Sequence, residues 1–293
     1  MKLDAAFFDT LSRLRLSMGR KSSMNLTGNR KSVQKGSSTE FSDFREYMPG
    51  DDIRRIDWNA YGRLDRLYVK EYMEEKEAVV SILLDTSASM NYGERKKSDL
   101  ACMLAAAMAY LGLNNMDRVI VYDVQKMEAP FVANGGKRAF PRLADWLGQR
   151  SFDGAADVAE AVKRLPAKGP GVTILISDFL QEEFVDKEGE TAKELLRFLD
   201  YRRQKAVFLH VLAEEELSVE LTGTRNFIDM EDKSTLRLTL DAASIRTYER
   251  ALNDFVSRLK RECATVGAVY ATCSTETDFH RLIFEDLRML YDI

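Results

Sequence analysis

Residues 79–90 read V-V-S-I-L-L-D-T-S-A-S-M, an apolar run that passes directly into a carboxylate and hydroxyl groups. The run from Val79 to Leu84 has the composition of a strand that is buried on both faces of a sheet. Residues 98–113 follow the polar turn, are rich in alanine, and predict a helix that packs closely on a sheet with Ser98 as its N-cap. The order of strand, turn and helix predicts one unit of an α/β fold.

Similar apolar runs recur downstream and alternate with helical segments. The expected strands are residues 119–122, a short strand near Phe131, and residues 172–176, 206–212 and 268–273. The expected helices are residues 139–148, 154–165, 188–203, 244–263 and 278–290. Apolar strands separated by helices indicate an α/β fold with a doubly wound, mainly parallel six-stranded sheet that has helices on both faces. Residues 222–240 interrupt the alternation and predict a β-hairpin.

The first 77 residues have a different pattern of apolar and charged residues. Residues 4–19 carry apolar side chains at spacings of three and four and predict an amphipathic helix. Residues 20–39 are rich in Ser, Gly, Lys and Asn and predict a loop, whereas residues 67–72 predict a strand. The charged residues between them alternate in sign, which favours a network of ion pairs and turns anchored by Trp58 and Tyr61.

Three regions follow from these patterns. We expect residues 1–35 to form a helix and a basic flexible arm. We expect residues 36–77 to form a small β-rich subdomain together with residues 213–241. The α/β domain is then expected to span residues 78–293.

Composition excludes several classes of protein. The 293 residues carry 43 Lys and Arg against 47 Asp and Glu, for a net charge of −4, and no run of apolar residues is long enough to cross a membrane. Two histidines and three scattered cysteines exclude a disulfide framework and a zinc site of Cys and His ligands. We therefore expect a cytoplasmic protein. Residues 1–39 hold eight basic and two acidic groups, which favours a solvated surface and leaves binding to nucleic acid or an anionic membrane as an alternative.

The turn after the first apolar strand carries the candidate chemistry. It contains no Gly-rich phosphate-binding motif, but Asp85, Ser87 and Ser89 are spaced so that an extended turn points them the same way. In a sheet of order 3-2-1-4-5-6 the strand order reverses between the strands that end at Asp85 and at Asp178, and ligands bind at that point. Carboxylate and hydroxyl oxygens suit Mg²⁺, Mn²⁺ or Ca²⁺. We expect a metal site of these four residues, with Asp123 as a weaker candidate.

These motifs also carry a resemblance to known families. D-T-S-A-S at 85–89, with I-S-D-F at 176–179, resembles the metal-ion-dependent adhesion site of von Willebrand factor A domains. The stretch E-F-S-D-F-R-E-Y-M-P-G-D-D-I-R-R-I-D-W-N-A-Y-G-R at 40–63, with L-Y-V-K-E-Y at 67–72, resembles the hallmark of the bacterial family called domain of unknown function 58 (DUF58). The resemblance covers residues 36 to about 290.

The resemblance implies a von Willebrand factor A-like fold and metal-mediated protein binding. By motif match, Asp85, Ser87 and Ser89 correspond to metal ligands, and Asp178 corresponds to the later aspartate. Such domains usually place a Thr in a G-x-T-D-like stretch, whereas this sequence has G-A-A-D at 154–157 with Ala156 in that position. The missing hydroxyl removes one ligand, which predicts either a weak metal site in which Asp157 compensates through water or a vestigial site.

We therefore expect a non-enzymatic, metal-dependent protein–protein interaction module. A partner's Asp or Glu would complete the coordination of the metal, and the resemblance implies a MoxR-type AAA+ ATPase or its client as that partner. The alternative is a metal-dependent hydrolase, a phosphoesterase, that uses the same cluster with Asp178 or Asp123 as base. Acidic side chains that follow the strand ends, among them Glu214, Glu215 and Glu216, predict a solvated surface or a negative collar around the site.

Overall fold

The computed structural model describes residues 5–17, 32–64, 66–74, 78–166, 170–185, 189–219, 223–230 and 234–292. The chain divides into two compact units, which are considered separately. The first unit comprises residues 1–17 and 78–293, and the second comprises residues 18–77.

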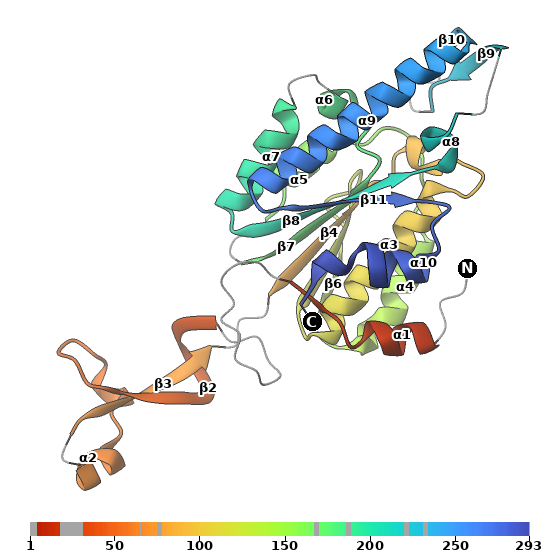
Figure 1. Ribbon diagram of the computed structural model, residues 1–293. Helices are drawn as coiled ribbons and strands as arrows, with labels where there is room; N and C mark the ends of the chain where they lie inside the picture. The colour runs from red at the N-terminus through yellow and green to blue at the C-terminus, as the bar shows by residue number, and fades with distance from the viewer. Residues whose placement is uncertain are drawn as a thin grey trace. The chain divides into compact units, whose positions relative to one another are not determined.

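The first unit is built on a six-stranded sheet, which confirms the predicted mainly parallel α/β architecture (Figure 1). The strand order is β11-β8-β7-β4-β5-β6, the predicted 3-2-1-4-5-6 arrangement. Neighbouring strands are parallel except β5 and β6, which run antiparallel. The strands are β4 Val79–Leu84, β5 Arg118–Asp123, β6 Phe131–Asn134, β7 Gly171–Ser177, β8 Gln204–Leu212 and β11 Val269–Ser274.

Helices cover both faces of this sheet. Figure 1 shows α5, α7 and α9 on one face and α3, α4 and α10 on the other, with α1 on the outside of the second layer. Their bounds are α1 Ala5–Leu11, α3 Lys97–Asn114, α4 Phe140–Gly148, α5 Val158–Lys163, α7 Glu190–Tyr201, α9 Ala242–Thr265 and α10 Phe279–Arg281. Short helical turns connect them: η2 Ala88–Asn91, η3 Lys137–Ala139, α6 Glu182–Val185, α8 Glu214–Leu217, π-helical η4 Leu282–Asp286 and η5 Arg288–Leu290.

Helix α3 packs tightly on the sheet because its inner face carries small side chains. Ala101, Ala105 and Ala109 are fully buried. At Gly112 an added Cβ would lie 2.7 Å from Cγ2 of Val119, so only glycine fits at this approach to β5. The predicted N-cap at Ser98 is wrong, since the helix begins one residue earlier and Lys96 occupies the cap position.

The predicted helix over residues 4–19 is also wrong in extent. Helix α1 ends at Leu11, and the chain then extends as β1, Arg15–Leu16, which pairs antiparallel with β12, Tyr291–Asp292. Ring contacts of Phe7 with Phe279 at 5.5 Å and of Phe8 with Tyr110 at 4.8 Å hold α1 in place. Tertiary pairing thus ends the helix where the sequence periodicity alone would continue it.

The second unit is centred on a two-stranded antiparallel ribbon of β2 Ser32–Glu46 and β3 Tyr68–Glu74. The turn η1 Ile53–Arg55 and helix α2 Trp58–Leu64 connect the two strands. The loop predicted over residues 20–39 is wrong from Ser32 onward, because that segment pairs with β3. The part of the expected basic arm at residues 18–31 lies outside the described residues.

Charged residues of the second unit form the expected ion pair and turns. Arg45 Nη2 contacts both carboxylate oxygens of Asp51, at 2.8 and 2.9 Å. Asp52 accepts a hydrogen bond from the backbone of Arg54, and Asp57 accepts one from Asn59. The rings of Trp58 and Tyr61 contact each other edge to face with centroids 6.3 Å apart and are 62% and 42% exposed, and their role as packing anchors stays a prediction.

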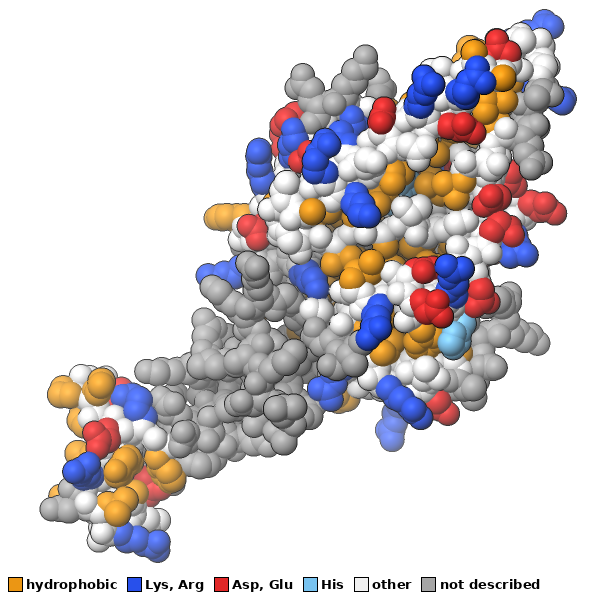
Figure 2. Space-filling view, viewed as in Figure 1, with side chains coloured by type: hydrophobic (Ala, Val, Ile, Leu, Met, Phe, Trp, Pro, Cys, Tyr) orange, Lys and Arg blue, Asp and Glu red, His pale blue; other side chains and the backbone are white. Residues whose placement is uncertain are grey.

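The predicted hairpin is present as β9 Gly223–Ile228 and β10 Thr235–Leu240. Phe227, Ile228, Leu236 and Leu238 are exposed on it, and Figure 2 shows apolar and basic side chains gathered at this end of the unit. The union of the hairpin with residues 36–77 in one subdomain stays a prediction. Within the described ranges, no helix is both long and apolar enough to cross a membrane.

Candidate functional site

The polar turn after β4 lies beside the end of β7. The backbone N–H of Asp85 donates to the carbonyl of Ile176 at 3.0 Å and extends the parallel ladder by one bond. The Asp85 carboxylate is fully buried, and both of its oxygens are engaged. Oδ1 accepts from the backbone N–H of Ser87 at 2.9 Å, and Oδ2 accepts from the hydroxyl of Ser177 at 2.5 Å.

The four predicted site residues meet at this point, and we call Asp85, Ser87, Ser89 and Asp178 the switch-point cluster. The hydroxyl oxygens of Ser87 and Ser89 lie 3.0 Å apart. Ser89 is also hydrogen-bonded to the Asp178 carboxylate, which is close enough to Asp85 for their charges to interact. Ser89 is the one member that is only half-buried, so solvent reaches the cluster from its side.

Two further charged residues belong to the site and were not predicted for it. Lys97, at the start of α3, is 1% exposed, and its Nζ lies 2.7 Å from Asp178 Oδ2 and 2.7 Å from Glu216 Oε1. The second oxygen of Glu216 accepts from the backbone N–H of Ala213 at 2.9 Å. The sequence contains one signal for Lys97. A lysine at the N-terminus of a helix is disfavoured by the helix dipole, so its presence there predicts a nearby acidic partner.

These contacts change the pKa values of the acidic groups. Burial, reinforced by the charge of Asp178, raises the pKa of Asp85 to about 6. Burial also disfavours the charged form of Asp178, but the adjacent Lys97 ammonium outweighs it and holds the pKa of that carboxyl below its usual range. Burial disfavours the charged form of Lys97 in the same way, and Asp178 and Glu216 reverse this and raise its pKa. Near neutral pH the site thus combines carboxylates with one ammonium.

Asp123 lies at the end of β5 and belongs to a different network. Its Oδ1 accepts from the hydroxyl of Thr86 at 2.6 Å and from the backbone N–H of Gln125 at 3.1 Å. Its Oδ2 lies 3.3 Å from Nη1 of Arg150. These contacts fix the β5 end to the turn after β4 and to the loop after α4, and none of them brings Asp123 to the switch-point cluster.

The loop with the G-A-A-D stretch borders the same turn. The backbone N–H of Ala88 donates to the Gly154 carbonyl at 2.8 Å. The Ala156 methyl packs against the apolar core, where a threonine would present a hydroxyl. Asp157 caps α5 by accepting from the backbone N–H of Glu160 at 2.8 Å. The loop therefore supplies backbone support to the turn, and its acidic side chain serves the helix.

The donor set fits a hard cation. The switch-point cluster offers carboxylate and hydroxyl oxygens, which are the ligands that Mg²⁺ and Ca²⁺ prefer. Within the part of the chain that the structure describes, no three His, Cys, Asp or Glu side chains gather as a metal centre, so a cation here would depend on the two serines. The weak affinity expected from Ala156 stays a prediction.

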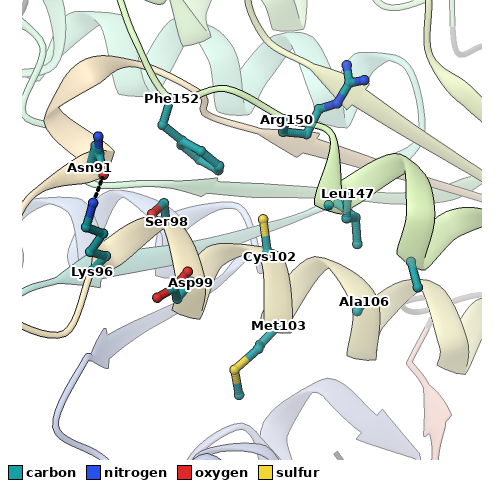
Figure 3. Close-up of a pocket in the computed structure, with 12 residues that line it drawn as sticks. Asn91, Lys96, Ser98, Asp99, Cys102, Met103, Ala106, Leu147, Arg150 and Phe152 are labelled. Carbon is teal, nitrogen blue, oxygen red and sulfur yellow. Dashed lines mark hydrogen bonds between the residues drawn. The ribbon is translucent and has the colours of Figure 1, made fainter. Parts of the chain in front are cut away.

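A groove of about 570 Å³ opens next to the turn (Figure 3). The side chains of Ser98, Asp99, Cys102 and Met103 on α3 line one side of it, and Arg150 and Phe152 of the loop after α4 line the other (Figure 3). None of the switch-point cluster residues lines this groove. It therefore adds no substrate space beside the cluster, and the hydrolase alternative stays a prediction.

Fold and site together define an α/β protein that gathers carboxylates and hydroxyls at the topological switch point of its sheet. The chain belongs to the family described as "Protein of unknown function DUF58", which matches residues 43–255. This finding confirms the family resemblance drawn from residues 40–72.

The chain is similar in sequence to two uncharacterized mycobacterial proteins. It is 29% identical over 180 residues to the uncharacterized protein Rv1480 of Mycobacterium tuberculosis and to the uncharacterized protein Mb1516 of Mycobacterium bovis. The match covers 58% of this chain and 56% of each relative, so the chain spans about half the length of the curated relatives it matches.

Two solved structures are similar over most of the chain. The conserved hypothetical protein BatB of Bacteroides thetaiotaomicron is 16% identical, with a TM-score of 0.40, over 73% of this chain and 98% of that one. An aerotolerance-related membrane protein of Bacteroides fragilis is 15% identical, with a TM-score of 0.39, over 72% and 99% of the two chains. Similarity at this level carries no argument about function.

Proposed function

We propose that this chain is a non-enzymatic protein-interaction module whose binding depends on a divalent cation held by Asp85, Ser87, Ser89 and Asp178. The observation that supports it most is the meeting of these four side chains at the ends of β4 and β7. The cation, Mg²⁺ or in its place Mn²⁺ or Ca²⁺, supplies an open coordination position that an Asp or Glu of the partner completes. The resemblance of D-T-S-A-S to the adhesion site of von Willebrand factor A domains supports the same function.

The charge balance of the site favours an added cation. Among the side chains described there, the Lys97 ammonium pairs with the carboxylates of Asp178 and Glu216, and the Asp85 carboxylate is close enough to Asp178 for their charges to interact. Unlike charges attract most strongly where solvent is excluded, and Asp85 and Asp178 are buried. The protein groups at the site thus leave negative charge that a divalent cation would neutralise.

The surroundings of the cluster make the cation a condition for binding. Figure 2 shows acidic side chains gathered at the end of the unit near α8, and Glu214 and Glu215 of that helix are exposed. A partner's carboxylate is repelled by these groups unless a cation lies between them. We propose that the partner is a MoxR-type AAA+ ATPase or a client of such an ATPase, which is the partner that the family resemblance implies.

Calorimetry with the full chain tests the proposal. Mn²⁺ is titrated into the wild type, into Asp85→Asn and into the matched control Asp99→Asn, whose side chain is exposed on α3. We expect saturable binding by the wild type and the control and at least about tenfold weaker binding by Asp85→Asn. Binding to a purified MoxR-type ATPase is then measured in Mg²⁺ and in EDTA. Equal binding in both solutions contradicts the proposed function.

A further inference from the structure

Lys97 is a buried ammonium that the proposed function does not use. Its side chain crosses from the first residue of α3 to the β7 end at Asp178 and to α8 at Glu216. Burial of a lysine is costly unless its charge is paired, and here both partners lie at hydrogen-bond distance. The adjacent Lys96 is exposed and contacts Asn91 Oδ1 at 2.7 Å, so the inward direction is specific to position 97.

The ammonium occupies a coordinating oxygen of the switch-point cluster. Asp178 Oδ2 is 2.7 Å from Lys97 Nζ, and Asp178 Oδ1 accepts from the backbone N–H of Leu180 at 3.2 Å. A divalent cation and an ammonium that share one carboxylate repel each other. The second carboxylate that contacts Lys97, that of Glu216, lies on a different element at 2.7 Å, so the ammonium keeps one partner if it loses Asp178.

We propose that Lys97 is the resident cation of the switch-point cluster, that it competes with a divalent cation for Asp178, and that it gives up Asp178 and keeps its contact with Glu216 when the divalent cation binds. This inference rests on the proposed function, since it describes how the same site regulates its occupancy. Lys97 acts as a positioning residue, and Glu216 is its second partner.

The loss of the contact between Lys97 and Asp178 would affect α8, because Lys97 also contacts Glu216 of that helix. The backbone carbonyl of Glu216 accepts from the Tyr248 hydroxyl of α9 at 3.1 Å, and Glu215 Oε1 accepts from the backbone N–H of Glu94 at 2.7 Å. A change in the contact between Lys97 and the Glu216 side chain therefore affects α8, which is hydrogen-bonded to Glu94 and to Tyr248 of α9. Occupancy of the cluster and the state of residues 213–217 are coupled.

The test compares Mn²⁺ binding by calorimetry and by electron paramagnetic resonance in the wild type, Lys97→Met and Lys97→Gln. Lys96→Met is the matched control, because it removes an ammonium one position away that does not contact the cluster. We expect both Lys97 variants to bind Mn²⁺ about tenfold more tightly than the wild type or more, with no change in the control. Lys97→Gln keeps a hydrogen-bond donor for Asp178 and serves where Lys97→Met does not fold.

A measurement on the unmodified protein adds a second readout. Hydrogen exchange of the wild type is compared with and without Mn²⁺. We expect the protection of residues 213–217 to change and the protection of α4 to stay the same. Unaltered exchange in residues 213–217 on saturation with Mn²⁺ overturns the coupling to α8.

The outcomes separate this inference from the proposed function. Equal Mn²⁺ affinity in the wild type and both Lys97 variants overturns the role of Lys97 and leaves the cation-dependent module intact. Binding by the Lys97 variants alone, at millimolar Mn²⁺, supports Lys97 as the resident cation and contradicts a divalent cation in the native protein. Absence of binding in every protein overturns both.

Discussion

Acid pH is expected to destabilise the first unit through His210. This histidine lies fully buried on β8, and its ring centroid is 5.6 Å from that of Phe179 and 5.8 Å from that of Phe255. Its Nδ1 lies 2.5 Å from the hydroxyl oxygen of Tyr270. Burial among these rings lowers the pKa of His210 to about 4, because a charged imidazolium would lose its hydration.

The size of the effect follows from the two pKa values. The unfolded chain binds the proton near the reference pKa of 6.5, and the folded chain binds it only near pH 4. This difference corresponds to about 3 kcal/mol of unfolding free energy, which is present above pH 6.5 and is lost as the pH falls through 4. Asp85 has the opposite sign, since its raised pKa favours the folded state as the pH falls through about 6.

Urea unfolding of the wild type and His210→Phe over this pH range isolates the contribution of His210. A Trp58→Phe background leaves Trp146 of α4 as the single tryptophan, so its fluorescence reports on the first unit. We expect His210→Phe to be less stable than the wild type at neutral pH, because it lacks the Tyr270 contact. On acidification its free energy of unfolding should fall by about 3 kcal/mol less than that of the wild type. The exposed His280, changed to Asn, is the control. Parallel loss of stability in the wild type and His210→Phe would refute the reasoning.

Three further substitutions test individual contacts by the same unfolding assay. Gly112→Ala forces a Cβ to within 2.7 Å of Val119 and is expected to cost about 1–3 kcal/mol, so a stability equal to that of the wild type would contradict the close approach of α3 to the sheet. Asp241→Ala removes the cap that accepts from two backbone N–H groups of α9 and is expected to cost about 1 kcal/mol, whereas Asp241→Asn should keep most of it. Ser177→Ala removes the hydroxyl that donates to Asp85 and is expected to cost about 2 kcal/mol at neutral pH and less below pH 6, and an equal cost at both pH values would count against that hydrogen bond.

The sheet could be predicted from the sequence because its strands are buried on both faces. All seven residues of β7 are buried, so the apolar run reports directly on the environment of the strand. Strand β2 could not be predicted in the same way, since Ser32, Gln34 and Lys35 are polar and only the pairing with β3 extends this segment. Local composition records burial, whereas pairing depends on a distant segment.

Some residues of the candidate site could be predicted from the sequence, and others could not. Asp85, Ser87 and Ser89 are neighbours in the sequence, and the expected strand order was enough to place Asp178 beside them. Lys97 and Glu216 are 119 positions apart, and a lysine and a glutamate of this kind look like solvated surface residues in any single sequence. Lys96 and Lys97 show the difficulty, because the same residue type is exposed at one position and buried at the next.

The pairing of β1 with β12 has a consequence for the order of assembly on the ribosome. Arg15 and Leu16 are synthesised before all six strands of the central sheet, whereas their partners Tyr291 and Asp292 are synthesised after them. Until then the nascent chain displays Phe7 and Leu16, which the finished fold buries, as a segment that chaperones and proteases can recognise. Pairing with β12 then buries that segment, so a chain cut before β12 is expected to keep it exposed.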